Sequence, residues 1–175
     1  MRTILVNWLL EVHLKFQLDT HIFLLTCHIM DLYLSRQQIP REKLQLVGVA
    51  ATLIANKYEY ESHCSSTNDF VDPDDMSFIT ARAYTREEVM EMEIHMLKVI
   101  DYRMPLPTAF DFLCCFAQPP TTSPLHQMCR YFIELCTLRP EPMYKYKPSH
   151  IAMASVFLAH KVLNLSDWVS SNRLV

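Results

Sequence analysis

The sequence predicts an all-α fold built from two small helical units, and three observations support this prediction. The 175-residue chain contains a single glycine, Gly48, whereas β-rich folds and phosphate-binding loops need glycine in their tight turns. Half of the residues are hydrophobic, enough to bury a core. Ten prolines fall mostly between apolar segments of helical spacing, where proline separates helices.

Charge and hydropathy exclude several classes of function. The net charge is −3 and no basic run stands out, so a nucleic-acid surface is not indicated. No apolar run reaches the roughly 20 residues that span a bilayer. The apolar start is interrupted by Asn7 and Glu11 and lacks a small-residue cleavage site, so it is not a signal peptide. We therefore expect an intracellular, soluble protein that binds neither nucleic acid nor membrane.

Six cysteines are scattered through the chain, and none forms a C-x-x-C pair. They are Cys27, Cys64, Cys114, Cys115, Cys129 and Cys136. Most lie in apolar segments, where a free cysteine behaves as a small hydrophobic residue. We expect structural thiols rather than disulfides or zinc ligands.

Residues 3–16 predict a first helix with one narrow polar stripe. The stripe consists of Thr3, Asn7, Glu11 and Lys15. Nearly everything else is apolar, which is typical of a helix buried by several neighbours. Ile4 and Trp8 flank the stripe, so we expect these two apolar side chains to reach the surface.

Two more helices are predicted for residues 21–34 and 41–58. The first has apolar residues at helical spacing. In the second, Gly48, Ala51 and Ala55 form a stripe of small residues that lets neighbouring helices approach closely. Residues 41–58 are therefore predicted to be the central helix of their unit.

Residues 59–83 are polar and rich in Asp and Ser, and they predict an exposed loop with a short helix at about 74–80. Thr85 then begins a new helix, because Glu88 three residues later completes a capping box. This helix is predicted to end near Ile100.

Three helices are predicted in the remainder, over residues 108–116, 124–138 and 148–162. Proline occupies the first helical position of the second of these, after a serine that can cap it. Pro140 and Pro142 are predicted to break the chain before the last helix.

An internal repeat indicates two copies of one helical unit. Residues 47–57 align with residues 151–161 at an offset of 104, and both segments are small-residue helices that end in lysine. We predict domains at 1–104 and 105–175. The first copy continues well past its lysine helix, so we expect the second copy to stop short, about two helices before its end.

Charged residues occur on apolar stripes at two places. Glu93 shares a helix face with apolar residues, and Lys57 is a candidate partner for an ion pair. Asp31 also lies among apolar residues, and Arg2 is its candidate partner. Such pairs are either purely structural or part of a binding site.

No arrangement of residues indicates catalysis. The sequence has no G-x-S-x-G, no H-E-x-x-H and no P-loop. The acidic pairs at 74–75 and 87–88 are more simply explained as solvated charges or capping groups. We expect no catalytic residue, no metal site and no cofactor.

Several segments, taken in order, resemble the cyclin family, and some lean towards the mitotic B type. The segments are residues 1–12, 13–16, 39–41, 43–49, 55–59, 83–87, 92–93, 96–99, 144–149 and 167–168. The resemblance implies the cyclin fold, with tandem five-helix boxes of which the second is incomplete. It also implies a non-catalytic subunit that activates a cyclin-dependent protein kinase, in G2/M control, in the nucleus and cytoplasm.

The resemblance assigns roles to individual residues. Cyclins hold the αC helix of the kinase so that its Lys–Glu ion pair can form. The matching kinase-binding positions are Lys57, Tyr58, Glu59, Glu93, Leu97 and Tyr102. The box-stabilising positions are Arg2, Asp31 and Leu46, and we expect Arg2 to pair with Asp31.

A second surface resembles the cyclin patch that takes Arg-x-Leu peptides of substrates and inhibitors. The matching residues are Met1, Ile4, Leu5, Trp8, Glu11, Leu44 and Gln45. An apolar groove beside Trp8 would take the leucine, and Glu11 would attract the arginine. The alternative is that Leu5 and Trp8 are simply core residues.

Some positions depart from the family pattern. Tyr60 stands where many cyclins have a second glutamate, Leu32 replaces the usual arginine after Asp31, and the loop at 60–80 is long. Other functions stay open: a cyclin-fold adaptor or transcription-factor-type module without kinase activation, a non-functional fragment, or, last, an enzyme.

Overall fold

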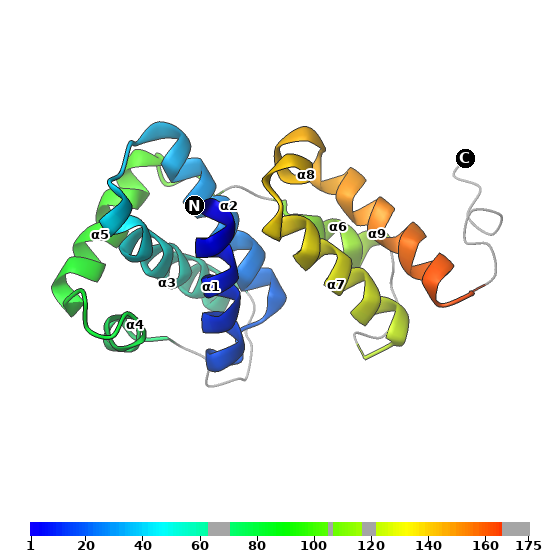
Figure 1. Ribbon diagram of the computed structural model, residues 1–175, viewed down its shortest axis with the longest axis horizontal. Coiled ribbons are helices and arrows are strands. Elements are labelled where there is room, and N and C mark those ends of the chain that lie inside the picture. Colours follow the sequence, from blue (N-terminus) through cyan, green and yellow to red (C-terminus); the bar gives the residue numbers. More distant parts are fainter. Residues whose placement is uncertain (63–70, 105–106, 117–121, 166–175) are drawn as a thin grey trace. The chain divides into compact units, whose positions relative to one another are not determined.

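The computed structural model describes residues 1–62, 71–104, 107–116 and 122–165, and these residues form helices and connecting segments without any strand. The predicted all-α fold is confirmed. The chain divides into two compact units, Met1–Leu106 and Pro107–Val175 (Figure 1).

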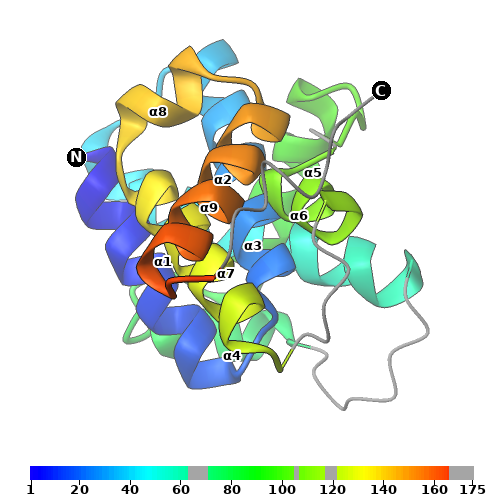
Figure 2. The same cartoon turned by 90° about the vertical axis from the view of Figure 1, so that its right-hand side faces the viewer.

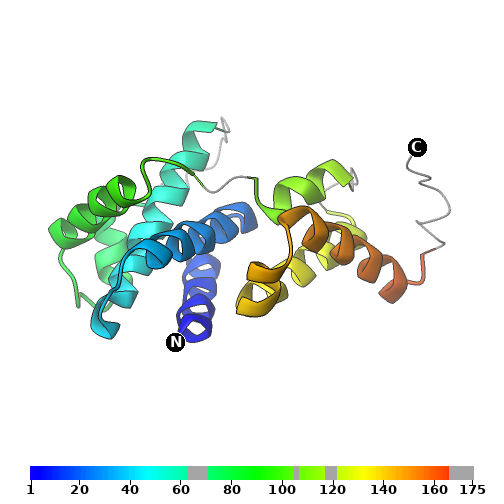
Figure 3. The same cartoon turned by 90° about the horizontal axis from the view of Figure 1, so that it is seen from above.

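In the described part of the first unit, five α-helices and one short 3-10 helix follow one another. They are α1 (Arg2–Phe16), α2 (Thr20–Arg36), η1 (Arg41–Lys43), α3 (Leu44–Ser62), α4 (Pro73–Ile79) and α5 (Arg86–Val99). Helix α3 is the centre of the unit: α2 and α5 pack along it, and α1 and α4 also contact it. Figure 3 shows α2 crossing α1 at a steep angle.

The central position of α3 depends on its small residues. Val47, Ala50, Ala51 and Ala55 are fully buried. A Cβ atom on Gly48 would lie 3.2 Å from Cδ2 of Leu9 and 3.4 Å from Cδ1 of Leu5. Glycine is therefore the residue that allows α1 to approach α3 this closely.

Side chains cap the helices of the first unit where the sequence predicts it. The backbone N–H of Thr85 donates to Oε2 of Glu88 at 2.8 Å, and the N–H of Glu88 donates to Oγ1 of Thr85 at 3.3 Å. This confirms the predicted capping box at the start of α5. Asp72 and Asp75 form a second capping box at the start of α4, which confirms the short helix predicted there.

Parts of the first unit differ from the prediction. Helix α3 continues to Ser62, where a loop was expected from residue 59. Val71 and Met76 are buried, so the segment around α4 is not simply an exposed loop. Leu14 is 71% exposed, because α1 covers the core with one side only. The centre of the predicted loop, at 63–70, lies outside the described residues.

The second unit contains α6 (Ala109–Phe116), α7 (Pro124–Leu138), α8 (Pro140–Lys145) and α9 (Pro148–Val162) within its described part. Helix α9 packs against α6 and α7. Figure 2 shows α8 at the end that α7 and α9 share.

Helix α8 was not predicted, and the reason is local. Pro140 and Pro142 both lie in its first turn, where backbone N–H groups have no partner within the helix. Proline therefore costs nothing there, and the two prolines begin a short helix instead of breaking the chain.

Candidate functional site

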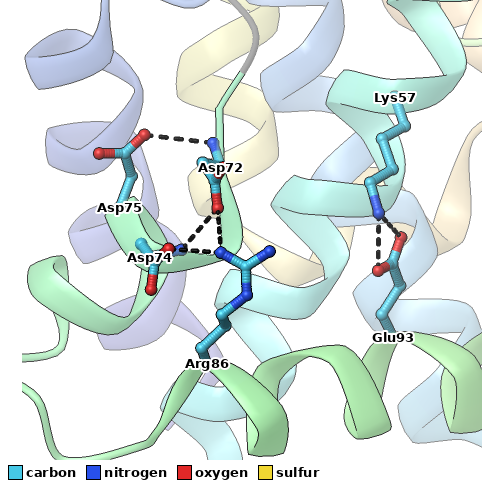
Figure 4. Close-up of polar contacts among 6 residues, drawn as sticks. All are labelled: Lys57, Asp72, Asp74, Asp75, Arg86 and Glu93. Carbon is cyan, nitrogen blue, oxygen red and sulfur yellow. Dashed lines mark hydrogen bonds and ion pairs between the residues drawn. The ribbon is translucent and has the colours of Figure 1, made fainter.

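The side chains of Lys57 and Glu93 meet between α3 and α5 (Figure 4). Nζ of Lys57 donates to both carboxylate oxygens of Glu93, at 2.7 and 2.8 Å. The Glu93 side chain is 10% exposed and the Lys57 side chain 39%. A nearly buried carboxylate needs such a partner, so the structure brings this predicted pair together, with the lysine end open to solvent.

Apolar side chains extend from this ion pair along α5. Leu97, one turn after Glu93, is half-buried, and Tyr102 beyond the helix is 64% exposed. Met90 and Ile94, which the sequence did not single out, are 40% and 49% exposed. Positions 90, 94 and 97 share one helix face, and this spacing is the signal that could have identified them. Tyr58, on α3, is half-buried.

Glu59 does not belong to that surface. It is 7% exposed, and its Oε2 lies 3.1 Å from Nδ1 of His21 at the start of α2. Two residues along a helix correspond to a rotation of about 200°, so Glu59 points to the side of α3 opposite Lys57. The structure gives it a contact within the unit and does not join it to Lys57 and Glu93.

Helix α5 is held at both ends. At its start, Nη1 of Arg86 donates to Oδ1 of Asp72 at 3.0 Å and also contacts Asp74 (Figure 4). At its end, Nη1 of Arg36 donates to the carbonyl oxygen of Val99 at 2.7 Å. These exposed contacts add to the packing of the buried residues Val89, Met92 and Met96, which holds α5, and therefore Glu93, against the rest of the unit.

Of the predicted box-stabilising residues, Arg2 and Asp31 are part-buried and Leu46 is buried. Nε and Nη2 of Arg2 donate to Oδ1 and Oδ2 of Asp31 at 2.8 and 2.7 Å. The expected pair is therefore present, as a two-point contact that joins α1 to α2. Leu46 is 5% exposed.

The seven residues of the predicted docking patch come from one face of α1 and the start of α3. Met1, Ile4 and Glu11 are exposed, Trp8, Leu44 and Gln45 are half-buried, and Leu5 is buried. Ile4 is 69% exposed, as its place beside the polar stripe predicted, and Met1 is 58% exposed. Leu5 is a core residue, as the alternative held for it, and Trp8 is partly accessible.

The described cysteines are all free thiols. Burial raises the pKa of the Cys129 thiol to about 11 and raises that of Cys27 further still. Cys27 and Cys129 are therefore inert core residues, whereas Cys114 and Cys115 are exposed. Cys64 lies outside the described residues, as do Asp167, Trp168 and the side chain of Tyr60.

No cluster of three His, Cys, Asp or Glu side chains among the described residues has the geometry to hold a metal ion. None of the helices described is both long and apolar enough to cross a bilayer.

Comparison with protein families matches almost the whole chain. The family described as "Cyclin, N-terminal domain" matches residues 1–105, and "Cyclin, C-terminal domain" matches residues 107–173. Two similar proteins are a putative cyclin-B3-1 of Arabidopsis thaliana, 37% identical over 97% of this chain, and a G2/mitotic-specific cyclin-B of Spisula solidissima, 38% identical over 98%. The chain spans 41% and 38% of those relatives' own lengths.

Solved structures share the fold. A viral cyclin from herpesvirus saimiri aligns with a TM-score of 0.79 at 23% identity, covering 95% of this chain and 72% of that one. A chain in the CAK complex of Chaetomium thermophilum bound to ATP-gamma-S aligns with a TM-score of 0.66 at 17% identity, covering 93% and 52%. At these identities the likeness concerns the fold alone.

Proposed function

The chain belongs to the cyclin family, and on that basis we propose that it is a non-catalytic subunit that binds and activates a cyclin-dependent protein kinase. The relatives named as B-type and G2/mitotic-specific cyclins support a role in G2/M control. The observation that carries the proposal is the Lys57–Glu93 pair, set in an otherwise apolar surface that includes Leu97, Ile94 and Tyr102.

The geometry of the pair suits the recognition of a helix end. The Lys57 ammonium uses two hydrogens on Glu93, and its third can reach a backbone carbonyl of a partner. The Glu93 carboxylate keeps lone pairs that can accept backbone N–H groups. Because each side chain already fixes the other, little further ordering is needed on binding.

The apolar residues around the pair would supply the binding energy. Met90 and Ile94 share a face of α5 with Leu97, and Tyr102 follows the helix; all of them except half-buried Leu97 are large exposed apolar side chains, and several of these near one another are typical of an interaction site. A kinase αC helix packed there would be held in the position that lets its own glutamate meet the catalytic lysine.

A separate part of the proposal concerns substrates and inhibitors. The α1 face with Met1, Ile4 and Trp8 would dock the leucine of an Arg-x-Leu peptide, while exposed Glu11 would pair with its arginine. Such docking would raise the local concentration of substrate at the kinase. We propose that the complex acts in the nucleus and cytoplasm.

The direct test is co-elution with a purified mitotic cyclin-dependent kinase, followed by a phosphorylation assay. The double variant Lys57→Ala/Glu93→Ala is compared with Glu91→Ala/Lys98→Ala, which removes the same charges from exposed positions of α5. We expect the wild type and the control to bind and activate the kinase, and the Lys57/Glu93 variant to lose both properties.

Other results would point elsewhere. A complex that forms without raising phosphorylation would refute activation and point to an inhibitory or truncated form. The protein would instead be a cyclin-fold adaptor without kinase activation under either of two results. In the first, the well-folded chain binds no cyclin-dependent kinase. In the second, the Lys57→Ala/Glu93→Ala variant binds its partner as well as the wild type does.

A further inference from the structure

Tyr102 follows α5 in a backbone conformation that tyrosine rarely adopts. Its φ angle is 55°, and that of Asp101 just before it is 56°. Both values lie in the left-handed region, where a residue with a Cβ atom is strained. Aspartate tolerates this region because its short side chain can bond locally, whereas a bulky aromatic residue does not. Such a conformation persists only where the surrounding structure holds it.

Packing of the side chains contributes little to holding this turn. Residues 101–103 are exposed, and Tyr102 is 64% exposed. The buried side chain of Ile100 anchors only the start of the turn. The backbone N–H of Tyr102 donates to the carbonyl oxygen of Leu97 at 2.9 Å, but at an exposed position water competes for such a bond. The turn therefore depends on contacts from outside α5.

Arg36 reaches this turn from the end of α2. Its Nη1 donates to the carbonyl oxygen of Val99 at 2.7 Å. Val99 is the last residue of α5, so its carbonyl group has no donor within the helix, and a guanidinium group there lies at the negative end of the helix dipole. Oδ2 of Asp101 lies 3.5 Å from the same nitrogen. Asp101 is 71% exposed, so this longer contact adds little.

The position of Arg36 is set by the residue one turn earlier on α2. Tyr33 is fully buried. Its hydroxyl donates to Sδ of Met92 at 3.8 Å, and its ring meets that of His95 edge-on, with the centroids 5.9 Å apart. Positions 33 and 36 share one face of a helix. The face of α2 that packs against α5 therefore also carries Arg36 to the end of α5.

We propose that Arg36 is a positioning residue of the kinase surface. By binding the Val99 carbonyl group, it keeps the turn in the left-handed form that presents Tyr102. This role rests on the kinase activation proposed above, and it requires no contact between Arg36 and the kinase. Without Arg36 the strained turn relaxes for part of the time. Binding must then restore it, which lowers the affinity for the kinase.

The first measurement needs no kinase. Amide hydrogen exchange, followed by NMR in the full chain, reports on the N–H groups of Asp101 and Tyr102. We expect Arg36→Ala to speed their exchange about fivefold and to leave α1 and α3 unchanged. The Arg36 side chain is 38% exposed, so the variant keeps its fold. Arg36→Lys should restore part of the protection, because an ammonium group can still donate to one carbonyl oxygen. Arg41→Ala, at an exposed position, is the matched control and should exchange as the wild type does.

The second measurement is the dissociation constant for a purified mitotic cyclin-dependent kinase, determined by calorimetry. We expect Arg36→Ala to raise it about fivefold, Arg36→Lys to raise it less, and Arg41→Ala to leave it unchanged. Arg36→Ala is then repeated in a Tyr102→Ala chain. There it should raise the dissociation constant by less than about twofold, because Arg36 acts through Tyr102.

Several outcomes overturn the proposal. An equal loss of affinity with and without Tyr102 would mean that Arg36 contacts the kinase directly. Unchanged exchange at Asp101 and Tyr102 in Arg36→Ala would mean that the turn does not depend on Arg36. If the wild type binds the kinase and Arg36→Ala binds it equally well, the positioning role alone is refuted. If the wild type binds no cyclin-dependent kinase, the proposed function fails, and the positioning role fails with it.

Discussion

Arg2 binds Asp31 through two parallel hydrogen bonds, from Nε and Nη2 to the two carboxylate oxygens, at 2.8 and 2.7 Å. The two residues are 29 positions apart and their side chains are 14% and 13% exposed. The contact therefore fixes the start of α1 on α2 from a largely desolvated position.

Removing one partner of this pair should cost more than a surface ion pair would. We expect Arg2→Ala to lower the free energy of unfolding by about 2–4 kcal/mol, because Asp31 keeps its burial and loses its donors. Arg2→Lys should recover only part of this, since an ammonium cannot make the two-point contact. Urea denaturation measures both effects. Arg41→Ala, at an exposed position, is the control and should change little; equal losses for the two arginines would contradict the structural role of Arg2.

His13 predicts a pH dependence of stability. It is 3% exposed, its Nδ1 lies 2.9 Å from the Leu9 carbonyl oxygen, and burial lowers its pKa from 6.5 to about 4. Below pH 6.5 the unfolded chain takes up a proton that the folded chain refuses until about pH 4, so acidification favours unfolding. The loss attributable to His13 is absent at pH 7, grows as the pH falls, and reaches about 3 kcal/mol near pH 4.

Denaturation at a series of pH values checks this prediction. His13→Gln keeps a donor for the Leu9 carbonyl but does not titrate, so its stability should fall less between pH 7 and pH 4. His150→Gln, at an exposed position, should retain the wild-type pH profile. Parallel profiles for wild type and His13→Gln would mean that His13 is not the group responsible.

Gly48 should tolerate no large side chain. A Cβ atom there already approaches Leu9 to 3.2 Å, so Gly48→Leu must push α1 away from α3. We expect a loss of about 3 kcal/mol or more in the free energy of unfolding. The neighbouring substitution Gln45→Leu, at a half-buried position, provides a control for added bulk on the same helix. Thermal unfolding compares the two variants. Equal stability of Gly48→Leu and Gln45→Leu would argue against close packing where α1 crosses α3.

The capping box of α5 makes a smaller and local contribution. Thr85→Ala removes the acceptor for the Glu88 N–H and should cost about 1 kcal/mol. Hydrogen exchange should speed up at the first turn of α5 and remain unchanged in α2. Thr3→Ala, at an exposed position in the first turn of α1, serves as the control, and uniform acceleration across both helices would show a global effect instead.

Ile94 offers a test of the proposed kinase surface that leaves the Lys57–Glu93 pair intact. It is 49% exposed, so Ile94→Glu should not affect folding, but the charge would have to be buried on binding. We expect the dissociation constant for the kinase to rise about tenfold or more, measured by calorimetry. Leu14→Glu, 71% exposed on α1, makes the same kind of change elsewhere; if it weakens binding as much, Ile94 is not part of the surface.

The sequence predicted most of the first unit because its signals are local. The capping box of Thr85 and Glu88 marks the start of α5, and the small residues of α3 mark the central helix. The acid at position 93 could be paired with Lys57 because each sits on an apolar face. Helix α8 was missed because the prolines were interpreted as breaks rather than as a first turn. The contact of Glu59 with His21 was not predicted, because the two residues are 38 positions apart and the periodicity of one helix does not reveal such a pair.

Helix α3 contributes to both surfaces proposed for the first unit, with Leu44 and Gln45 at its start and Lys57 and Tyr58 thirteen residues later. At 1.5 Å per residue, the rigid rod between Leu44 and Lys57 measures about 20 Å. One polypeptide that occupied both surfaces would need at least about six extended residues to bridge them. The helix therefore sets the spacing between these two groups of residues, and an inhibitor that reaches both Leu44 and Lys57 needs a linker of that length.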